Sequence, residues 1–188
     1  FEFFSQAALD KVIKRQGHSA PFATQAPFYA LIEFETRTQV TSVALALFEQ
    51  CAAQGWVLDG VVSQSLAQTR ALWRLREDIS ETLWHWQPYK NDISVRVSKM
   101  SDFLAEVDQL VAARYPDFEI VWYGHIGDGN LHLNILKPED LPQTEFFERC
   151  GIVSLEIGEL LARYGGSISA EHGVGLLKKS LLPYSRSP

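Results

Sequence analysis

The chain has 188 residues, of which 46% are hydrophobic, 12% aromatic and 21% charged. This composition is typical of a globular protein and excludes disordered, collagenous and coiled-coil chains. Lysine and arginine number 17 against 23 aspartate and glutamate residues, giving a net charge of −6, so we expect no nucleic-acid partner. No apolar run approaches the roughly 18 residues of a membrane-spanning helix, and we expect no transmembrane segment.

Two further features concern the origin of the chain. It begins with Phe1 and its single methionine is Met100, so we interpret it as part of a longer protein. The two cysteines, Cys51 and Cys150, lie in segments of helical pattern. We interpret them as buried free thiols in a reducing, cytoplasmic compartment, with a disulfide between them as the alternative. Peripheral membrane association of the longer protein stays open.

Hydrophobic periodicity and turn residues divide the first half of the chain into alternating elements. In chain order we predict a helix over 7–15, a strand over 28–35, a helix over 38–53, a strand over 56–63 and a longer helix over 66–86. Pro88 ends the last helix. The segment 28–63 would therefore form a β-α-β unit with its helix packed over the sheet.

The second half has a more regular order. We predict a strand over 90–97, a helix over 101–114, strands over 118–126 and 131–136, a helix over 143–164 and a short extended segment over 167–170. This β-α-β-β-α-β order is that of a ferredoxin-like unit. We therefore predict an α+β fold, in which an antiparallel sheet carries helices on one face.

Two histidines flank a turn between the strands 118–126 and 131–136. Asp128-Gly129 is a strong signal for a two-residue hairpin turn, and such a turn places His125 directly opposite His132. Two imidazoles so placed can converge on one metal ion. Asn134 shares their face, whereas the other face is apolar. The alternative is a polar pair of histidines on a solvated face.

A second motif offers a further metal ligand. The segment 169–175 contains Glu171 and His172 between small and flexible residues. Two histidines and one glutamate, with an open position for substrate, form the ligand set of catalytic zinc sites. The alternative is that Glu171 and His172 are surface residues that precede a helix.

Three polar residues suit the binding of a carboxylate. Arg76 and Ser80 lie four positions apart and share a helix face, and Lys90 follows the Pro88 turn. A guanidinium, a hydroxyl and an ammonium can together hold a carboxylate. The alternative is exposure to solvent or pairing with acidic neighbours: Glu77, Glu81 and Asp92.

The motifs together resemble a known family. They are GHIGDGNLHLN at 124–134, SAEHGVGLLKK at 169–179, LWRLRED at 72–78 and YKNDISV at 89–95. They resemble the C-terminal substrate domain of FAD-linked 2-hydroxy-acid oxidoreductases of the vanillyl-alcohol-oxidase type, which include D-lactate dehydrogenases and D-2-hydroxyglutarate dehydrogenases. The D-2-hydroxyglutarate dehydrogenase branch is the most similar.

The resemblance implies roles for the candidate residues. It implies His125, His132 and Glu171 as ligands of a divalent metal, usually zinc, and His172 as the catalytic base. It also implies that Asn134 lies at the substrate, and that Arg76, Ser80 and Lys90 bind its carboxylates. The flavin is bound mainly by an N-terminal domain that has no counterpart here. Residues 1–188 would then be a single substrate domain of a larger FAD-dependent enzyme. We expect this domain to fold alone but to be inactive without the rest of the enzyme.

The reaction implied by the resemblance is oxidation of a small D-2-hydroxy acid to the 2-oxo acid. His172 would accept the hydroxyl proton while hydride leaves for the flavin. One alternative is a non-catalytic ferredoxin-like module that binds metal or a small molecule, and another is a zinc hydrolase. The sequence leaves open the hydroxy acid, the electron acceptor, the metal and the oligomeric state, a homo-oligomer included.

Overall fold

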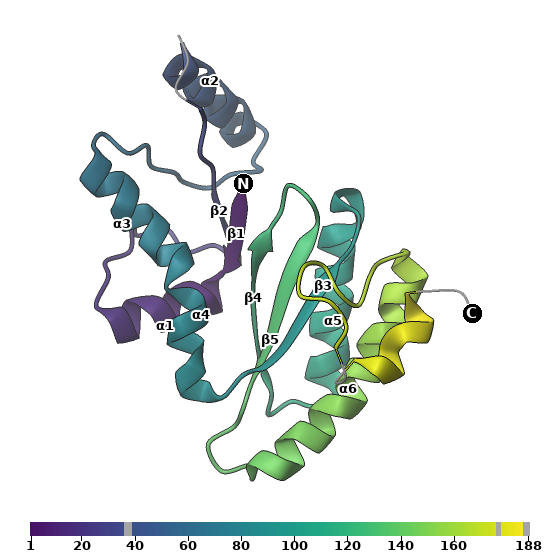
Figure 1. The fold of residues 1–188 in the computed structure, drawn as a ribbon. Helices are drawn as coiled ribbons and strands as arrows, with labels where there is room; N and C mark the ends of the chain where they lie inside the picture. Colours follow the sequence, from purple (N-terminus) through teal and green to yellow (C-terminus); the bar gives the residue numbers. More distant parts are fainter. Residues whose placement is uncertain (36–38, 176–177, 186–188) are drawn as a thin grey trace.

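A computed structural model of the chain describes residues 1–35, 39–175 and 178–185. Its centre is a five-stranded antiparallel sheet in the order β2-β1-β4-β5-β3 (Figure 1). The strands are β1 (Glu2–Ser5), β2 (Phe28–Leu31), β3 (Tyr89–Ser94), β4 (Glu119–His125) and β5 (Asn130–Leu136). The predicted α+β class with an antiparallel sheet is confirmed.

Helices form most of the remaining structure. They are α1 (Gln6–Gln16), α2 (Val40–Ala53), α3 (Leu66–Glu77), α4 (Ile79–Leu83), α5 (Met100–Arg114) and α6 (Gln143–Tyr164). Short 3-10 segments are η1 (Trp84–Trp86), η2 (Val97–Lys99) and η3 (Lys179–Tyr184). Within the described ranges, no helix is both long enough and apolar enough to cross a membrane.

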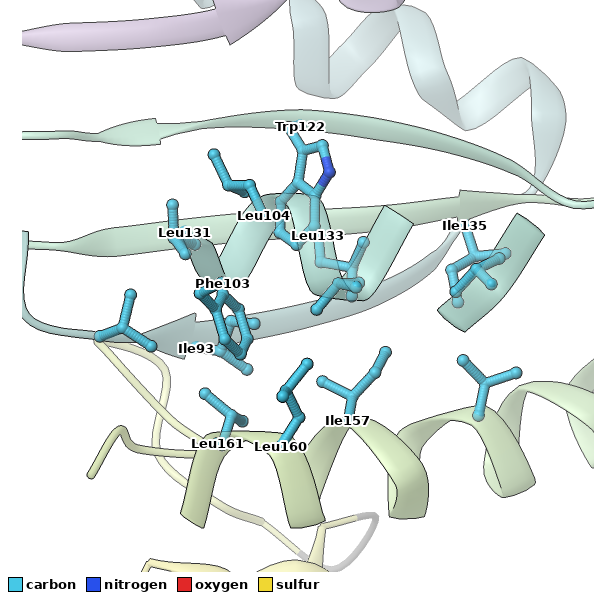
Figure 2. Close-up of a cluster of buried hydrophobic side chains, with 14 of the residues drawn as sticks. Ile93, Phe103, Leu104, Trp122, Leu131, Leu133, Ile135, Ile157, Leu160 and Leu161 are labelled. Atoms are coloured by element: carbon cyan, nitrogen blue, oxygen red, sulfur yellow. The ribbon is translucent and has the colours of Figure 1, made fainter. Parts of the chain in front are cut away.

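The C-terminal half has the predicted ferredoxin-like order. β3, α5, β4, β5 and α6 follow one another, and a single antiparallel bridge between Ser94 and Ser167 takes the place of the last strand. The apolar face of this sheet packs against α5 and α6. Figure 2 shows the side chains in that core, among them Ile93, Phe103, Trp122, Leu131, Leu133, Ile157 and Leu160.

Helices cover the second face of the sheet as well, so the prediction of helices on one face is wrong. A second core joins α1, α3 and α4 to this face of β1, β2, β4 and β5. The reason lies in the alternation of β4, because Val121 and Tyr123 are also buried and face this second core. Phe4 of β1, a strand that the sequence analysis did not predict, extends the same surface. The candidate site residues lie on this second face, where the sheet meets α3 and α4.

The predicted β-α-β unit over 28–63 is also wrong. α2 contributes no buried residue, and Figure 1 shows it standing apart from the sheet. Its predicted first residue, Thr38, lies outside the described residues. The segment 56–63 forms no strand and pairs with none, and within it the carboxylate of Asp59 accepts the N–H of Gly60 at 2.8 Å. Such a local bond competes with strand pairing.

The predicted helix over 66–86 is divided into α3, α4 and η1. Ser65 caps α3 by accepting the N–H of Gln68 at 3.3 Å. The division falls at Asp78, whose carboxylate contacts His18 at 2.7 Å and Arg74 at 3.3 Å. It places the end of α3 and the start of α4 over β1 and β4.

Both cysteines are free thiols, as predicted. Cys150 is buried in α6, and its burial raises the pKa of the thiol to about 12. Cys51 is only partly buried, which corrects the expectation for that residue. The reason is that α2 does not pack on the sheet.

Candidate functional site

The hairpin between β4 and β5 brings the two histidines onto one face, but not in the predicted register. His125 lies opposite Asn130, and Tyr123 lies opposite His132. The loop therefore spans four residues instead of two. Because the difference is an even number, His125 and His132 still share a face. The register is wrong and the shared face is confirmed.

Turn conformation explains the longer loop. A two-residue type I′ turn needs a positive φ at both central positions, whereas only Gly129 has one, at 79°. Asp128 instead accepts the N–H of Asn130 with its carboxylate, at 3.1 Å. The carbonyl of Gly129 accepts the N–H of Val95 at 3.1 Å. The hairpin tip is therefore fixed against the end of β3.

We expect Gly129→Ala to destabilise the protein by about 2 kcal/mol or more, because it combines backbone strain with overpacking. A Cβ at this position would lie 1.9 Å from the Val95 carbonyl oxygen. Gly127→Ala is the matched control, since a Cβ there has only a contact at 3.9 Å. Urea unfolding measures both variants, and equal midpoints would contradict the expectation.

The three predicted metal ligands come together. One ligand atom from each of His125, His132 and Glu171 lies within 4.8 Å of the others. The rings of His125 and His132 are 5.6 Å apart. Nε2 of His125 lies 3.3 Å from a carboxylate oxygen of Glu171, and Asn130 donates to the same carboxylate. The β4–β5 hairpin thus meets the loop after α6 that carries Glu171.

Asp92 of β3 anchors that loop, and the sequence analysis missed this role. Its carboxylate accepts the backbone N–H groups of Glu171 and His172, each at 2.9 Å. Burial alone raises the pKa of Asp92, but the hydrogen bonds from His172 and Glu171 and the nearby imidazoles outweigh it and lower the pKa. Lys178 also donates to the backbone carbonyl of Asp92, at 2.9 Å. Leu176 and Leu177 of the motif lie outside the described residues.

The imidazoles differ in their surroundings. His132 is largely buried, and desolvation lowers its pKa to about 4. It is therefore neutral at neutral pH, which is the form that binds a metal. The ring of His172 lies 6.0 Å from that of His132 and is 68% exposed. Nδ1 of His172 is 3.4 Å from the carboxylate of Asp92, and Nε2 lies 4.0 Å from the carboxylate of Glu171.

The predicted carboxylate-binding residues face the same space from the helix layer. Arg76 is 8% exposed, so the alternative of a solvated arginine is wrong. Its guanidinium pairs with Glu2 at 2.8 Å and lies over the ring of Tyr123, 4.7 Å from the ring centre. Lys90 donates to Ser80 at 3.3 Å, and burial lowers the pKa of Lys90. The two cations come from α3 and β3.

All eight predicted site residues line one pocket of about 410 Å³. Asn134 is fully buried within this group and lies opposite Lys90 in the sheet. Seven buried side-chain N and O atoms of the described chain lack a hydrogen-bond partner, and four belong to residues lining this pocket: Arg76, Asn91, Asp92 and Asn134. Buried polar groups are normally paired, so the pocket has unused capacity for a polar ligand.

The donor set of this pocket fits a divalent metal. Two imidazole nitrogens and one carboxylate oxygen are zinc-type ligands, and a set of three leaves the fourth position of a tetrahedral ion for a substrate oxygen. A second pocket of about 500 Å³ includes Trp122 of the opposite sheet face, and Asp108 is the only acid or base among its lining residues. The acidic, basic and imidazole side chains are therefore concentrated in the first pocket.

Comparison with known proteins identifies the family to which the chain belongs. Residues 1–188 match the family described as FAD linked oxidases, C-terminal domain. The chain is 60% identical to a D-2-hydroxyglutarate dehydrogenase of Stutzerimonas stutzeri, covering 100% of this chain and 41% of the relative. It is 52% identical to the enzyme of that name from Xanthomonas citri pv. viticola, covering 100% of this chain and 40% of the relative.

A more distant relative is a putative mitochondrial D-lactate dehydrogenase of Schizosaccharomyces pombe, 33% identical over 100% of this chain and 37% of the relative. The chain thus spans about two fifths of the length of the curated relatives it matches. The family resemblance inferred from the motifs is confirmed. This chain belongs to the family of FAD-linked oxidases and corresponds to their C-terminal domain.

Proposed function

We propose that this chain is the substrate domain of an FAD-dependent D-2-hydroxy-acid dehydrogenase, which oxidises D-2-hydroxyglutarate or D-lactate to the 2-oxo acid. The observation that carries the proposal is that one pocket contains three possible metal ligands and two cationic side chains. The possible ligands are His125, His132 and Glu171, and the cations are Arg76 and Lys90. The names of the relatives support it, since they include both kinds of dehydrogenase. The flavin would be held mainly by the part of the protein outside this chain.

In this proposal His125, His132 and Glu171 hold a divalent ion, with zinc as the first candidate. The ion, when bound, lowers the pKa of a substrate hydroxyl and thereby eases its deprotonation. Nε2 of His172 accepts the hydroxyl proton, while Nδ1 faces the carboxylate of Asp92. The flavin, when bound, supplies the acceptor for the hydride that leaves the substrate carbon.

The remaining residues orient the substrate. Arg76 and Lys90 provide two positive charges on different elements of the pocket wall. Two carboxylates match this arrangement, and D-2-hydroxyglutarate has the second carboxylate that D-lactate lacks. Ser80 and Asn134 add a hydroxyl and an amide for hydrogen bonding. D-2-hydroxyglutarate is therefore our preferred substrate.

The function is tested with the full-length enzyme carrying its flavin. Anaerobic mixing with D-2-hydroxyglutarate should bleach the absorption of the oxidised flavin, whereas the L-enantiomer should not. D-lactate serves as the comparison for the second carboxylate. A flavin spectrum unchanged by all D-2-hydroxy acids, in a protein that binds metal, would favour the non-catalytic binding module instead.

Arg76→Ala is expected to raise KM by about 10- to 100-fold with a smaller effect on kcat, because a charged hydrogen bond to the substrate carboxylate is lost in ground and transition states alike. Arg76→Lys should give an intermediate KM, since it keeps the charge but not the planar fork. Arg74→Ala is the matched control on the same helix, with a 59% exposed side chain. Steady-state kinetics of the full-length enzyme decides, and equal KM values for Arg76→Ala and Arg74→Ala would refute a substrate contact.

A further inference from the structure

Glu2 is a buried carboxylate that the sequence analysis did not consider. It lies at the start of β1, directly opposite His125 of β4 in the antiparallel register. Only 8% of the residue is exposed. Because burial of an unpaired carboxylate is costly, Glu2 requires partners for its charge.

The two oxygens of Glu2 contact two different residues of the pocket. Oε1 lies 2.8 Å from Nδ1 of His125, and Oε2 lies 2.8 Å from a terminal nitrogen of Arg76. One carboxylate therefore connects a candidate metal ligand to a candidate substrate-binding residue.

Both ring nitrogens of His125 face a carboxylate, Nδ1 that of Glu2 and Nε2 that of Glu171, so a metal bound by Nε2 requires the hydrogen on Nδ1. A carboxylate paired with a guanidinium acts as an acceptor, so Glu2 can accept that hydrogen from Nδ1. The lone pair of the ring is then on Nε2, which lies 3.3 Å from Glu171 in the triad. Histidine ligands of metals commonly donate their second nitrogen to a carboxylate, which orients the ring and strengthens it as a ligand.

We propose that Glu2 is a positioning residue that sets the tautomer and orientation of His125 for metal binding and holds Arg76 in place for the substrate. The inference rests on the proposed function, because it assumes that the triad binds a divalent ion. Glu2 touches neither the ion nor the substrate and acts through its two neighbours. The expected consequence is that loss of its charge weakens metal and substrate binding together.

The test uses the full-length enzyme, stripped of metal and titrated with Co²⁺ alone while its visible absorption is followed. Glu2→Gln should weaken Co²⁺ binding by about 10- to 100-fold, the usual effect of removing such a carboxylate, and should raise KM for the hydroxy acid. Glu2→Asp keeps the charge and should recover part of both losses. Glu156→Gln is the matched control, since Glu156 is a 17% exposed glutamate paired with Arg114 outside the pocket.

The outcomes separate the two proposals. If the wild type binds Co²⁺ and His132→Ala does not, the metal site stands, and wild-type affinity in folded Glu2→Gln then overturns the role of Glu2 alone. If the wild type and His132→Ala bind alike, the metal site and the inference fail together. A purely structural role would lower the melting temperature but leave the Co²⁺ affinity of the folded variant unchanged. Should Glu2→Gln not fold, the nitrogen-15 NMR shifts of His125 in the metal-free wild type decide, with hydrogen on Nε2 in place of Nδ1 overturning the proposal.

Discussion

Replacement of His172 by alanine is expected to lower kcat of the full-length enzyme by about 10²- to 10⁴-fold, the usual range for loss of a general base, while bound metal is retained. The structure gives two reasons for this combination. His172 is not a member of the triad of possible ligand atoms. Its ring is 68% exposed, so its removal leaves no large cavity.

The measurement pairs steady-state kinetics with metal analysis of the purified variant. The pH dependence of kcat should also lose the limb that reports deprotonation of the base. His85→Ala is the matched control, because His85 is an exposed histidine that does not line the pocket. If His172→Ala lost its metal, His172 would be a ligand and the assignment of the base would be wrong.

Replacement of His132 by alanine should act differently, by stripping the metal and reducing turnover to near background. The triad would keep only His125 and Glu171, and two ligands bind a divalent ion far more weakly than three. Excess divalent ion should restore part of the rate, because it repopulates the weakened site by mass action. His125→Ala should give the same result for the same reason.

Metal content and rate measured at several concentrations of added zinc test this expectation. His18→Ala is a suitable control, since its imidazole pairs with Asp78 at 2.7 Å outside the pocket. Full metal occupancy and full rate in His132→Ala would contradict the role of the triad. The contrast with His172→Ala matters most, because only separate roles predict metal loss in one variant and metal retention in the other.

Several elements follow from local sequence. The alternation of β4 and β5 places His125, His132 and Asn134 on one face, and this does not depend on the exact register as long as the loop has an even length. The helical periods of α5 and α6 likewise predict their buried faces. These features are local because neighbouring positions along one strand or helix determine them.

The exact register depended on a tertiary contact. The Asp128-Gly129 pair is compatible with a two-residue turn, yet the hydrogen bond from Val95 to the Gly129 carbonyl joins the tip to the end of β3. Similarly, the pattern of 56–63 suits a strand, but no strand of the sheet pairs with it. Strand formation requires a partner, and local propensity does not supply one.

The sequence by itself determined the family, the helices and strands of the C-terminal half, and eight of the twelve residues that line the pocket. Only the tertiary structure revealed the carboxylates behind them. Glu2 and His125 are 123 positions apart, and Asp92 and Glu171 are 79 positions apart. Their pairing depends on the order of strands in the sheet and on helices covering both of its faces, and neither is encoded in local periodicity.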